Sequence, residues 1–367
     1  MLSLAACQSS GMDGLETAST GDQPAEQSYG EGATTLAMLV PLSEGTGQGR
    51  KARDFRDGAA LAISELGGGN VRLMVYDTAA SPRQVTHLAD EARKSGARLI
   101  IGPTDTAALA AVAAVPSAQR PPVLSLAGRG ASGAGVYTIV SDAVDSALEA
   151  ARIAIGAGRK SFVAVVPANG AAEVGGRLAQ GFIDSKAAFA GVVPYGSPGA
   201  SLAGEMAAQK ALLAKADGVM IFGEGRAPAA VAAALRSASL VKSDVTLIGN
   251  LAWTSDNFSN SALDGAIVAM ADQSSLAQIA ERYRAAHGRA VTMEAAYGYD
   301  AVAVAAGIVR QMGPDALTPM TLTKPSGFRG ATGTFRLRAD GSVERPLALY
   351  RFKAGALELV DEAPAAF

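Results

Sequence analysis

Short runs of apolar residues alternate with amphipathic stretches along most of the chain. The first run, at residues 34–40, precedes a Gly-rich turn at residues 43–49 and a helical pattern at residues 53–66, whose apolar side chains share one face. Continuous apolar runs of this length are typical of parallel strands that helices cover on both sides. The pattern therefore predicts an α/β fold built from alternating strands and helices.

The same alternation continues in two series. In the first series we expect strands at residues 71–76, 98–101, 122–126 and 136–139, and helices at residues 82–95 and 106–115. In the second series we expect helices at residues 144–155, 173–189, 202–214 and 228–239, and strands at residues 161–166, 191–194, 218–222, 246–248 and 266–270. Two doubly wound, Rossmann-like lobes follow, and in such sheets ligands bind at the carboxyl ends of the strands.

The end of the chain has a different pattern. Two helical patterns, at residues 275–287 and 294–311, follow each other with no strand between them. A Gly-rich segment at residues 327–335 comes next, and then two strands with a turn at residues 339–341. Consecutive helices and a hairpin do not extend a doubly wound sheet, so we expect them to be additions to both lobes.

Composition and charge narrow the class of protein. With 367 residues, of which 49% are hydrophobic, the chain is long enough for two domains with separate cores. Its formal net charge is -2 and Lys and Arg are not gathered into a run, which excludes the electrostatic pattern of a nucleic-acid-binding surface. No stretch reaches the roughly 20 apolar residues that a membrane-spanning helix needs.

The single cysteine, Cys7, ends the string Leu-Ala-Ala-Cys after a short apolar opening. A small-residue cleavage site after an apolar segment marks an exported protein, and one that ends in Cys resembles the lipobox of bacterial lipoproteins, in which that Cys is acylated. The alternative is a Cys that occurs by chance in an unstructured tail. We interpret residues 1–7 as a lipoprotein signal segment, and residues 8–33, rich in Ser, Gly, Thr and acidic residues, as a flexible tether.

Gln8 bears on the location of the anchored protein. In bacterial lipoproteins an Asp directly after the acylated Cys retains the protein at the inner membrane, and this chain has Gln8 there. The resemblance therefore implies a periplasmic protein that is lipid-anchored in the outer membrane rather than the inner membrane.

Several strings, taken in their order, resemble the type I periplasmic binding proteins, the fold of the branched-chain amino-acid receptors of ABC importers. The strings that carry the resemblance are at residues 39–43 with 56–62, 75–78 with 81–82, 100–103, 296–302, and 328–333 with 340–341. The resemblance implies an N-terminal lobe at residues 34–140 plus 275–328 and a C-terminal lobe at residues 141–274 plus 329–367. It also implies a multi-strand hinge whose crossings lie near residues 140–141, 270–275 and 329–333.

The resemblance also implies where a ligand binds. In this family the loops after two neighbouring strands of the first lobe meet the ligand. The positions that match the cleft are Thr104, Asp105, Thr106, Gly128 and Arg129 in the first lobe and Val174, Glu224 and Trp253 in the second lobe. Helix N-termini at such loops attract an anion such as a carboxylate.

Two positions depart from the amino-acid receptors. This chain has Val174 where those receptors place an aromatic residue, and Asn250 where they place the acidic partner of the α-ammonium group. These departures argue against a zwitterionic amino acid as the ligand. Trp253 has two interpretations, a plug of the core or a platform in the cleft, because its loop is polar while the indole is large and apolar.

Enzymatic and cofactor sites find little support in the sequence. The glycines at residues 45–49 follow a strand, but their spacing does not fit a dinucleotide fingerprint. His87 and His287 lie on different expected helices without Cys partners, so no metal-ligand set is formed, and both are expected at the surface. Asp142 and Asp145 match a helix cap and first-turn acid rather than a catalytic pair. We therefore expect no enzyme, no metal and no cofactor.

Two functions remain. The first is a periplasmic, lipid-anchored solute-binding protein that closes on a small ligand, an amino acid or a related compound, and is read by an ABC permease. The second is an outer-membrane lipoprotein activator of a penicillin-binding protein, with no transported solute, because residues 322–328 and 334–338 look similar to proteins of that group.

Overall fold

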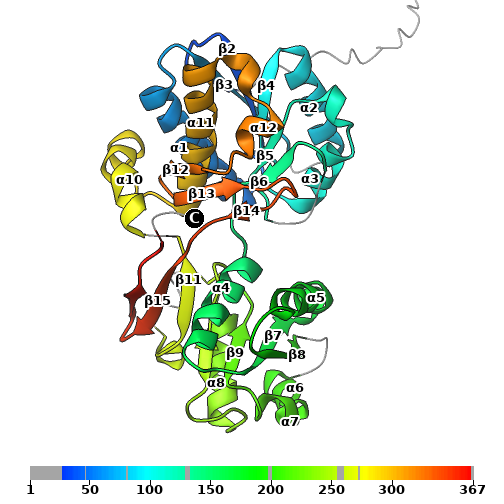
Figure 1. Cartoon of the computed structure of the whole chain (residues 1–367), viewed down its shortest axis with the longest axis vertical. Helices are drawn as coiled ribbons and strands as arrows, with labels where there is room; N and C mark the ends of the chain where they lie inside the picture. The colour runs from blue at the N-terminus through cyan, green and yellow to red at the C-terminus, as the bar shows by residue number, and fades with distance from the viewer. Residues whose placement is uncertain are drawn as a thin grey trace, which may run out of the picture.

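The computed structural model describes residues 27–45, 47–79, 82–128, 133–196, 201–253, 260–271 and 273–364. It confirms the expected α/β fold with two lobes, which Figure 1 shows one above the other. Of the described helices, none combines the length and the apolar composition needed to cross a membrane.

The first lobe is built on a mostly parallel sheet with the strand order β1-β3-β2-β4-β5-β6. All residues of the central strand β2 are buried, which explains the uninterrupted apolar run in the sequence. Its elements in chain order are β1 (Gln27–Tyr29), β2 (Thr34–Val40), α1 (Gly47–Leu66), β3 (Val71–Asp77), α2 (Pro82–Lys94), β4 (Ala97–Ile101), α3 (Thr106–Ala113), β5 (Val123–Ser125) and β6 (Val136–Thr138).

Successive side chains of β2 point to opposite faces of this sheet. Leu36 and Met38 belong to a core shared with α1 and the later helices α10 (Gln273–His287) and α11 (Met293–Met312). Ala37 and Leu39 belong to a second core under α2 and α3. The sheet is therefore covered on both faces, as a doubly wound lobe requires.

The second lobe contains a sheet with the order β16-β15-β11-β10-β9-β7-β8. Strands β7 to β11 are parallel, and β15 and β16 continue the sheet in antiparallel pairing. Its elements are α4 (Ala143–Gly156), β7 (Ser161–Pro167), α5 (Ala171–Phe182), β8 (Ala188–Tyr195), α6 (Leu202–Ala208), α7 (Lys210–Leu213), β9 (Gly218–Ile221), α8 (Ala227–Ser237), β10 (Thr246–Ile248), β11 (Ile267–Met270), β15 (Ala348–Lys353) and β16 (Ala356–Asp361).

Three expected element boundaries are wrong. Helix α1 begins at Gly47 rather than residue 53, because glycines are weak helix formers and hide its first turns. A Cβ on Gly49 would lie 1.8 Å from the Glu44 carbonyl oxygen, so this tight helix start needs glycine. Helix α5 ends at Phe182, and Phe189, expected in the helix, lies in β8 against the Phe182 ring, 5.7 Å away. Gln209 divides the helix expected at residues 202–214 into α6 and α7.

The segment expected to be a tether is structured at its end. Gln27–Tyr29 form β1, which pairs antiparallel with β3. The chain then passes so close to the end of β3 that a Cβ on Gly32 would lie 2.1 Å from the Val71 nitrogen. Residues 27–29 are therefore part of the first sheet rather than of a tether, because the edge of β3 offers free backbone groups to a further strand.

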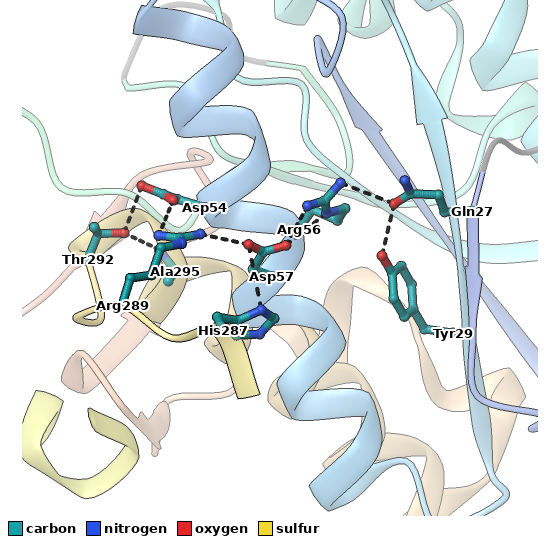
Figure 2. A network of polar contacts seen from close by, with 9 residues as sticks. All are labelled: Gln27, Tyr29, Asp54, Arg56, Asp57, His287, Arg289, Thr292 and Ala295. Carbon is teal, nitrogen blue, oxygen red and sulfur yellow. Dashed lines mark hydrogen bonds and ion pairs between the residues drawn. The ribbon is translucent and has the colours of Figure 1, made fainter. Parts of the chain in front are cut away.

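A polar network ties this N-terminal strand and α1 to the segment before α11 (Figure 2). Arg289 bridges Asp54 and Asp57 of α1, with N···O distances of 2.5 and 2.6 Å. Arg56 pairs with Asp57 at 2.7 Å and donates to the Gln27 side chain at 3.3 Å. Networks of several charges hold better than isolated surface pairs, so three distant parts of the sequence are fixed together.

Helices α1 and α11 cross at very close range. A Cβ on Gly58 would lie 1.8 Å from the Ala295 carbonyl oxygen, and one on Gly298 would lie 2.0 Å from the Phe55 carbonyl oxygen. Since real Cβ atoms do not approach backbone oxygens so closely, both positions require glycine. The crossing fixes the N-terminal half of α11 over the first lobe.

The hairpin with the turn at residues 339–341 belongs to the first lobe, whereas the sequence predicts it in the C-terminal lobe. Strands β12 (Phe328–Gly330), β13 (Gly333–Leu337) and β14 (Val343–Glu344) form a small sheet of their own, preceded by the short helix α12 (Pro319–Leu322). Phe335 and Leu337 are 0% and 2% exposed within the first-lobe core, which holds residues 329–344 there. The third hinge crossing is therefore at residues 345–347, not at residues 329–333; the other two lie between β6 and α4 and between β11 and α10.

Candidate ligand-binding cleft

A cleft of about 380 Å³ lies between the two lobes, next to the first crossing. From the first lobe it is lined by Gln48, Lys51 and Phe55 of α1, Thr104 after β4, Leu126 and Gly128 after β5, and Met293, Glu294 and Tyr297 at the start of α11. The crossing supplies residues 140–143, and the second lobe supplies Glu224 after β9 and Leu251 and Ala252 after β10. The cleft thus lies at the carboxyl ends of parallel strands of both sheets, where α/β proteins bind ligands.

Thr104 is placed by the sharp turn that follows β4. Gly102 has a φ of 100°, and a Cβ there would lie 2.3 Å from the Leu39 carbonyl oxygen, so the turn needs glycine. Asp105 then caps α3, its carboxylate accepting from the Ala108 N–H at 2.8 Å. Between them, the Thr104 Oγ1 atom is buried and has no hydrogen-bond partner. Buried polar atoms in proteins are usually hydrogen-bonded, so this hydroxyl is available to a group that enters the cleft.

Charged groups from both lobes face the cleft. Lys51, Glu224 and Glu294 line it, and none of them makes an ion pair with another described residue. Asp142 is different, because it pairs with Arg177 at 2.7 Å and accepts from the Val144 N–H at 2.9 Å at the start of α4. Lys51, Glu224 and Glu294 are therefore available to a ligand, whereas the Asp142 carboxylate is already bound to Arg177 and to the start of α4.

The floor of the cleft rests on a buried arginine. Arg345, 8% exposed, donates from Nε to the Ser141 hydroxyl at 3.3 Å and from Nη2 to the Ile139 carbonyl at 2.9 Å. Its Nη1 donates to the Thr332 carbonyl at 2.9 Å. Its guanidinium lies over the ring of Tyr297, 5.2 Å from the centroid. Ser141 and Tyr297 both line the cleft, so the fork of Arg345 fixes two of its walls.

Asp300 is linked to this buried cation through the Thr332 hydroxyl. Its carboxylate, completely buried, accepts from the Ala331 and Thr332 N–H groups at 2.6 and 2.9 Å, and from the Thr332 hydroxyl, which also accepts from Arg345. Burial raises the pKa of Asp300, and the Thr332 hydrogen bond and the positive charge of Arg345 oppose that rise. Burial likewise lowers the pKa of Arg345. Both oxygens of Asp300 act as acceptors, which is the arrangement of an ionised carboxylate.

The residues predicted from the sequence are divided by the structure. Thr104, Gly128 and Glu224 line the cleft together. Asp105 and Thr106 adjoin it as the cap and first residue of α3, and are not among the lining residues. Arg129 and Cys7 lie outside the described residues.

Val174 and Trp253 lie away from the cleft. Val174 packs against the core beneath α4 and α5. Trp253 is 3% exposed, its Nε1 donates to the Ile221 carbonyl at 3.0 Å, and its ring lies 5.4 Å from that of Phe352. It is therefore a core residue, because the indole finds both an apolar partner and an acceptor inside the second lobe. Asn250 is also fully buried and donates to the same Ile221 carbonyl at 2.9 Å.

His287 is not the surface residue expected from the sequence. Its ring is half-buried against Tyr283, with 4.6 Å between centroids, and its Nδ1 lies 3.7 Å from the Asp57 carboxylate. His87 is exposed on α2, as expected.

Sequence reasoning missed Lys51, Glu294 and Arg345. The signal for Lys51 was the true start of α1: once the helix begins at Gly47, Gln48, Lys51 and Phe55 follow at helical spacing at the carboxyl end of β2. Glu294 stands in the first turn of α11. Arg345 carries no local signal, since its partner Ser141 is 204 residues away in the sequence.

Comparison with known proteins places this geometry in a family. A family model described as periplasmic binding protein matches residues 33–356. No curated protein sequence is a significant match. A putative branched-chain amino acid ABC transporter structure from Rhodospirillum rubrum is similar at 17% identity and a TM-score of 0.72, covering 89% of this chain and 100% of that one.

Two further structures are similar. A branched chain amino acid ABC transporter periplasmic ligand-binding protein from Burkholderia xenovorans has 17% identity and a TM-score of 0.74, over 89% of this chain and 94% of that one. An ABC transporter solute binding protein from R. palustris, in complex with benzoate, has 20% identity and a TM-score of 0.65, over 91% and 97%. The family model spans most of the chain, and this protein therefore belongs to the type I periplasmic binding proteins, a family of solute-binding proteins that are not enzymes.

Proposed function

We propose that this protein binds a small solute in the cleft between its lobes and delivers it to an ABC permease. The observation that carries the proposal is the Thr104 Oγ1 atom, which is buried at the cleft and has no partner in the chain. Leaving such a group unpaired costs about 1–3 kcal/mol. A ligand group hydrogen-bonded to Thr104 removes this cost, and a cleft of about 380 Å³ has the size of a small-molecule site.

The unpaired charges indicate the chemistry of the solute. Glu224 and Glu294 favour a cationic or hydroxyl group, and Lys51 and Thr104 favour an acceptor such as a carboxylate. Val174 and Asn250 stand at the positions with which amino-acid receptors hold their ligand. In this chain Val174 packs against the second-lobe core and Asn250 donates to the Ile221 carbonyl, so neither side chain faces the cleft. If the solute carries an ammonium group, Glu224 and Glu294 are therefore the side chains that pair with it, at positions that differ from those of the amino-acid receptors.

The proposal includes a lipid anchor at Cys7 and a place on the periplasmic side of the outer membrane. The first described strand begins at Gln27, 20 residues after Cys7. At about 3.3–3.6 Å per residue, the anchor keeps the body within roughly 70 Å of the membrane surface. Acylation is tested by metabolic labelling with radioactive palmitate, which should mark the wild-type chain and not Cys7→Ser; labelling of both chains would exclude Cys7 as the anchor.

Solute binding is tested by thermal unfolding in the presence of single compounds. The panel contains branched-chain amino acids and benzoates, because solved structures of similar proteins hold isoleucine and benzoate, together with short peptides and muropeptides. A solute at 100 times its Kd stabilises the native state by about 2.7 kcal/mol. Thr104→Val should reduce this stabilisation and leave the ligand-free protein folded. A flat panel would overturn the proposal in favour of the alternative, an activator of a penicillin-binding protein without a transported solute.

A further inference from the structure

A groove of about 420 Å³ lies on the first lobe, away from the cleft. It runs between the C-terminal half of α11, the short helix α12 and β12, all on one side of the lobe in Figure 1. None of its lining residues lines the cleft. Its floor and walls are mainly apolar, formed by Val304, Ile308, Met312, Met320 and Phe328 among others.

The rim of the groove exposes large apolar side chains. Met312 is 62% exposed and Met320 is 83% exposed, and both lie at this groove. Clustered apolar exposure beside a groove marks an interaction site more often than single exposed residues do. Methionine suits such a surface, because its unbranched and polarisable side chain adapts to the shape of a partner.

Gly307 keeps the groove open. A Cβ at Gly307 would meet no atom within 4 Å, whereas one at Gly298 in the same helix would lie 2.0 Å from a backbone oxygen. Packing within the chain therefore explains Gly298 and does not explain Gly307. A glycine inside a helix costs about 0.5–1 kcal/mol relative to alanine. At Gly307 this cost leaves free space above the α11 backbone, inside the groove.

The accessible charged side chains of the groove are both positive. Lys324 lies with its Nζ 4.5 Å from the centroid of the Phe328 ring, and Arg329 is exposed; neither makes an ion pair with another described residue. Asp300 is the sole carboxylate among the described residues that line the groove, and it is fully buried and bonded to the Ala331 and Thr332 N–H groups. An occupant therefore meets apolar walls and two available cations.

We propose that this groove docks a segment of a partner protein that carries apolar side chains flanked by carboxylates. The apolar side chains enter between Met312 and Met320, over Gly307, and the carboxylates pair with Lys324 and Arg329. The complementarity is specific, because a basic segment would place like charges together at no gain. This docking is independent of any solute in the cleft.

The experiment follows the methionine methyl groups of the full chain by NMR after ¹³C-methyl labelling. The Met312 and Met320 signals are assigned from Met312→Leu and Met320→Leu. The probe is a short synthetic amphipathic peptide with leucines on one face and glutamates on either side, and its control has lysine at every glutamate. We expect the acidic peptide to shift both signals saturably below about 1 mM, and the basic peptide to bind at least about tenfold more weakly.

Two kinds of variant test the proposal further: one reverses the charges at Lys324 and Arg329, and the other fills the groove with a larger side chain at Gly307. Lys324→Glu with Arg329→Glu should reverse the preference, so that the basic peptide binds more tightly. Gly307→Leu should abolish the shifts, whereas Gly307→Ala, which adds only a methyl group, should remain folded and bind. Absence of saturable shifts, equal binding of both peptides, or unchanged preference after charge exchange would each overturn the proposal.

Discussion

The hinge offers the sharpest test of how this structure is held together, through Arg345→Met. Methionine has a similar length and fills much of the same space, but it cannot donate hydrogen bonds. The substitution removes the bonds from the Arg345 guanidinium to the Ile139 carbonyl, the Thr332 carbonyl and the Ser141 hydroxyl. It also removes the positive charge that opposes the rise in the pKa of the buried Asp300 carboxylate.

The magnitude follows from burial. A hydrogen bond from a charged donor contributes about 1.5–3 kcal/mol, and each buried carbonyl left unpaired costs about 1–3 kcal/mol. These terms overlap, and removal of one member of a buried charged network typically destabilises by about 3–5 kcal/mol. We therefore expect Arg345→Met to lower the free energy of unfolding by about 3–5 kcal/mol. The control is Arg338→Met: Arg338 is 51% exposed and pairs with Glu344 at the surface, so its loss should cost about 1 kcal/mol or less.

The assay is urea denaturation followed by circular dichroism, completed as a double-mutant cycle with Asp300→Asn. In the Asp300→Asn background, Arg345→Met should lower the free energy of unfolding by a smaller amount than it does in the wild type. The double variant should therefore be more stable, by about 1–3 kcal/mol, than the sum of the two single effects predicts. Additivity within about 0.5 kcal/mol would show that the two buried groups do not sense each other. A loss below about 1 kcal/mol for Arg345→Met would refute the reasoning altogether.

Three further predictions rest on single contacts. Thr104→Val should leave the free energy of unfolding unchanged or raise it by up to about 1–3 kcal/mol, because it deletes a buried hydroxyl that has no partner; destabilisation in urea would show that the chain itself uses this hydroxyl. Gly298→Ala should destabilise by about 1–3 kcal/mol through its clash with Phe55, whereas Gly307→Ala in the same helix should stabilise by about 0.5–1 kcal/mol; thermal unfolding that ranks them equally would contradict the close helix crossing. Burial and the hydrogen bond to Glu65 raise the pKa of Tyr299 to about 12 from 10.0, so its contribution to stability is present below pH 10 and is lost as pH rises from about 10 through 12. Denaturation at alkaline pH should therefore show a flatter loss for Tyr299→Phe than for the wild type, and parallel curves would refute the assignment.

The alternation of strands and helices could be predicted from the sequence because buried parallel strands are apolar without interruption. Strand β2 illustrates this, since both of its faces are covered. The start of α1 could not be predicted, because glycines in its first turns lower the helical signal while tertiary packing stabilises them. The prediction that the hairpin of β13 and β14 lies in the other lobe is wrong, because nothing local in its sequence shows which core Phe335 enters.

In the candidate site too, local sequence predicts some residues and only tertiary packing reveals the others. Thr104, Gly128 and Glu224 were accessible to prediction because they directly follow strands, and strand ends meet at one edge of a sheet. Trp253 also follows a strand, yet its indole turns inward to Phe352 and the Ile221 carbonyl, which only the packed second lobe reveals. Lys51, Glu294 and Arg345 are brought in by helices and a hinge segment from distant parts of the chain.

The contacts of the first crossing hold two adjacent residues, Ser141 and Asp142, to different lobes. Ser141 is held to the first lobe, because Arg345 bonds its hydroxyl while also bonding Thr332 and lying over the Tyr297 ring. Asp142, the next residue, is held to the second lobe by Arg177 and by the N–H groups at the start of α4. We therefore expect rotation about this crossing to concentrate at the link between these two adjacent residues, both of which line the cleft. On the proposed function, a solute that contacts this link is expected to shift the angle between the lobes directly, because its differential contacts lie at the turning point.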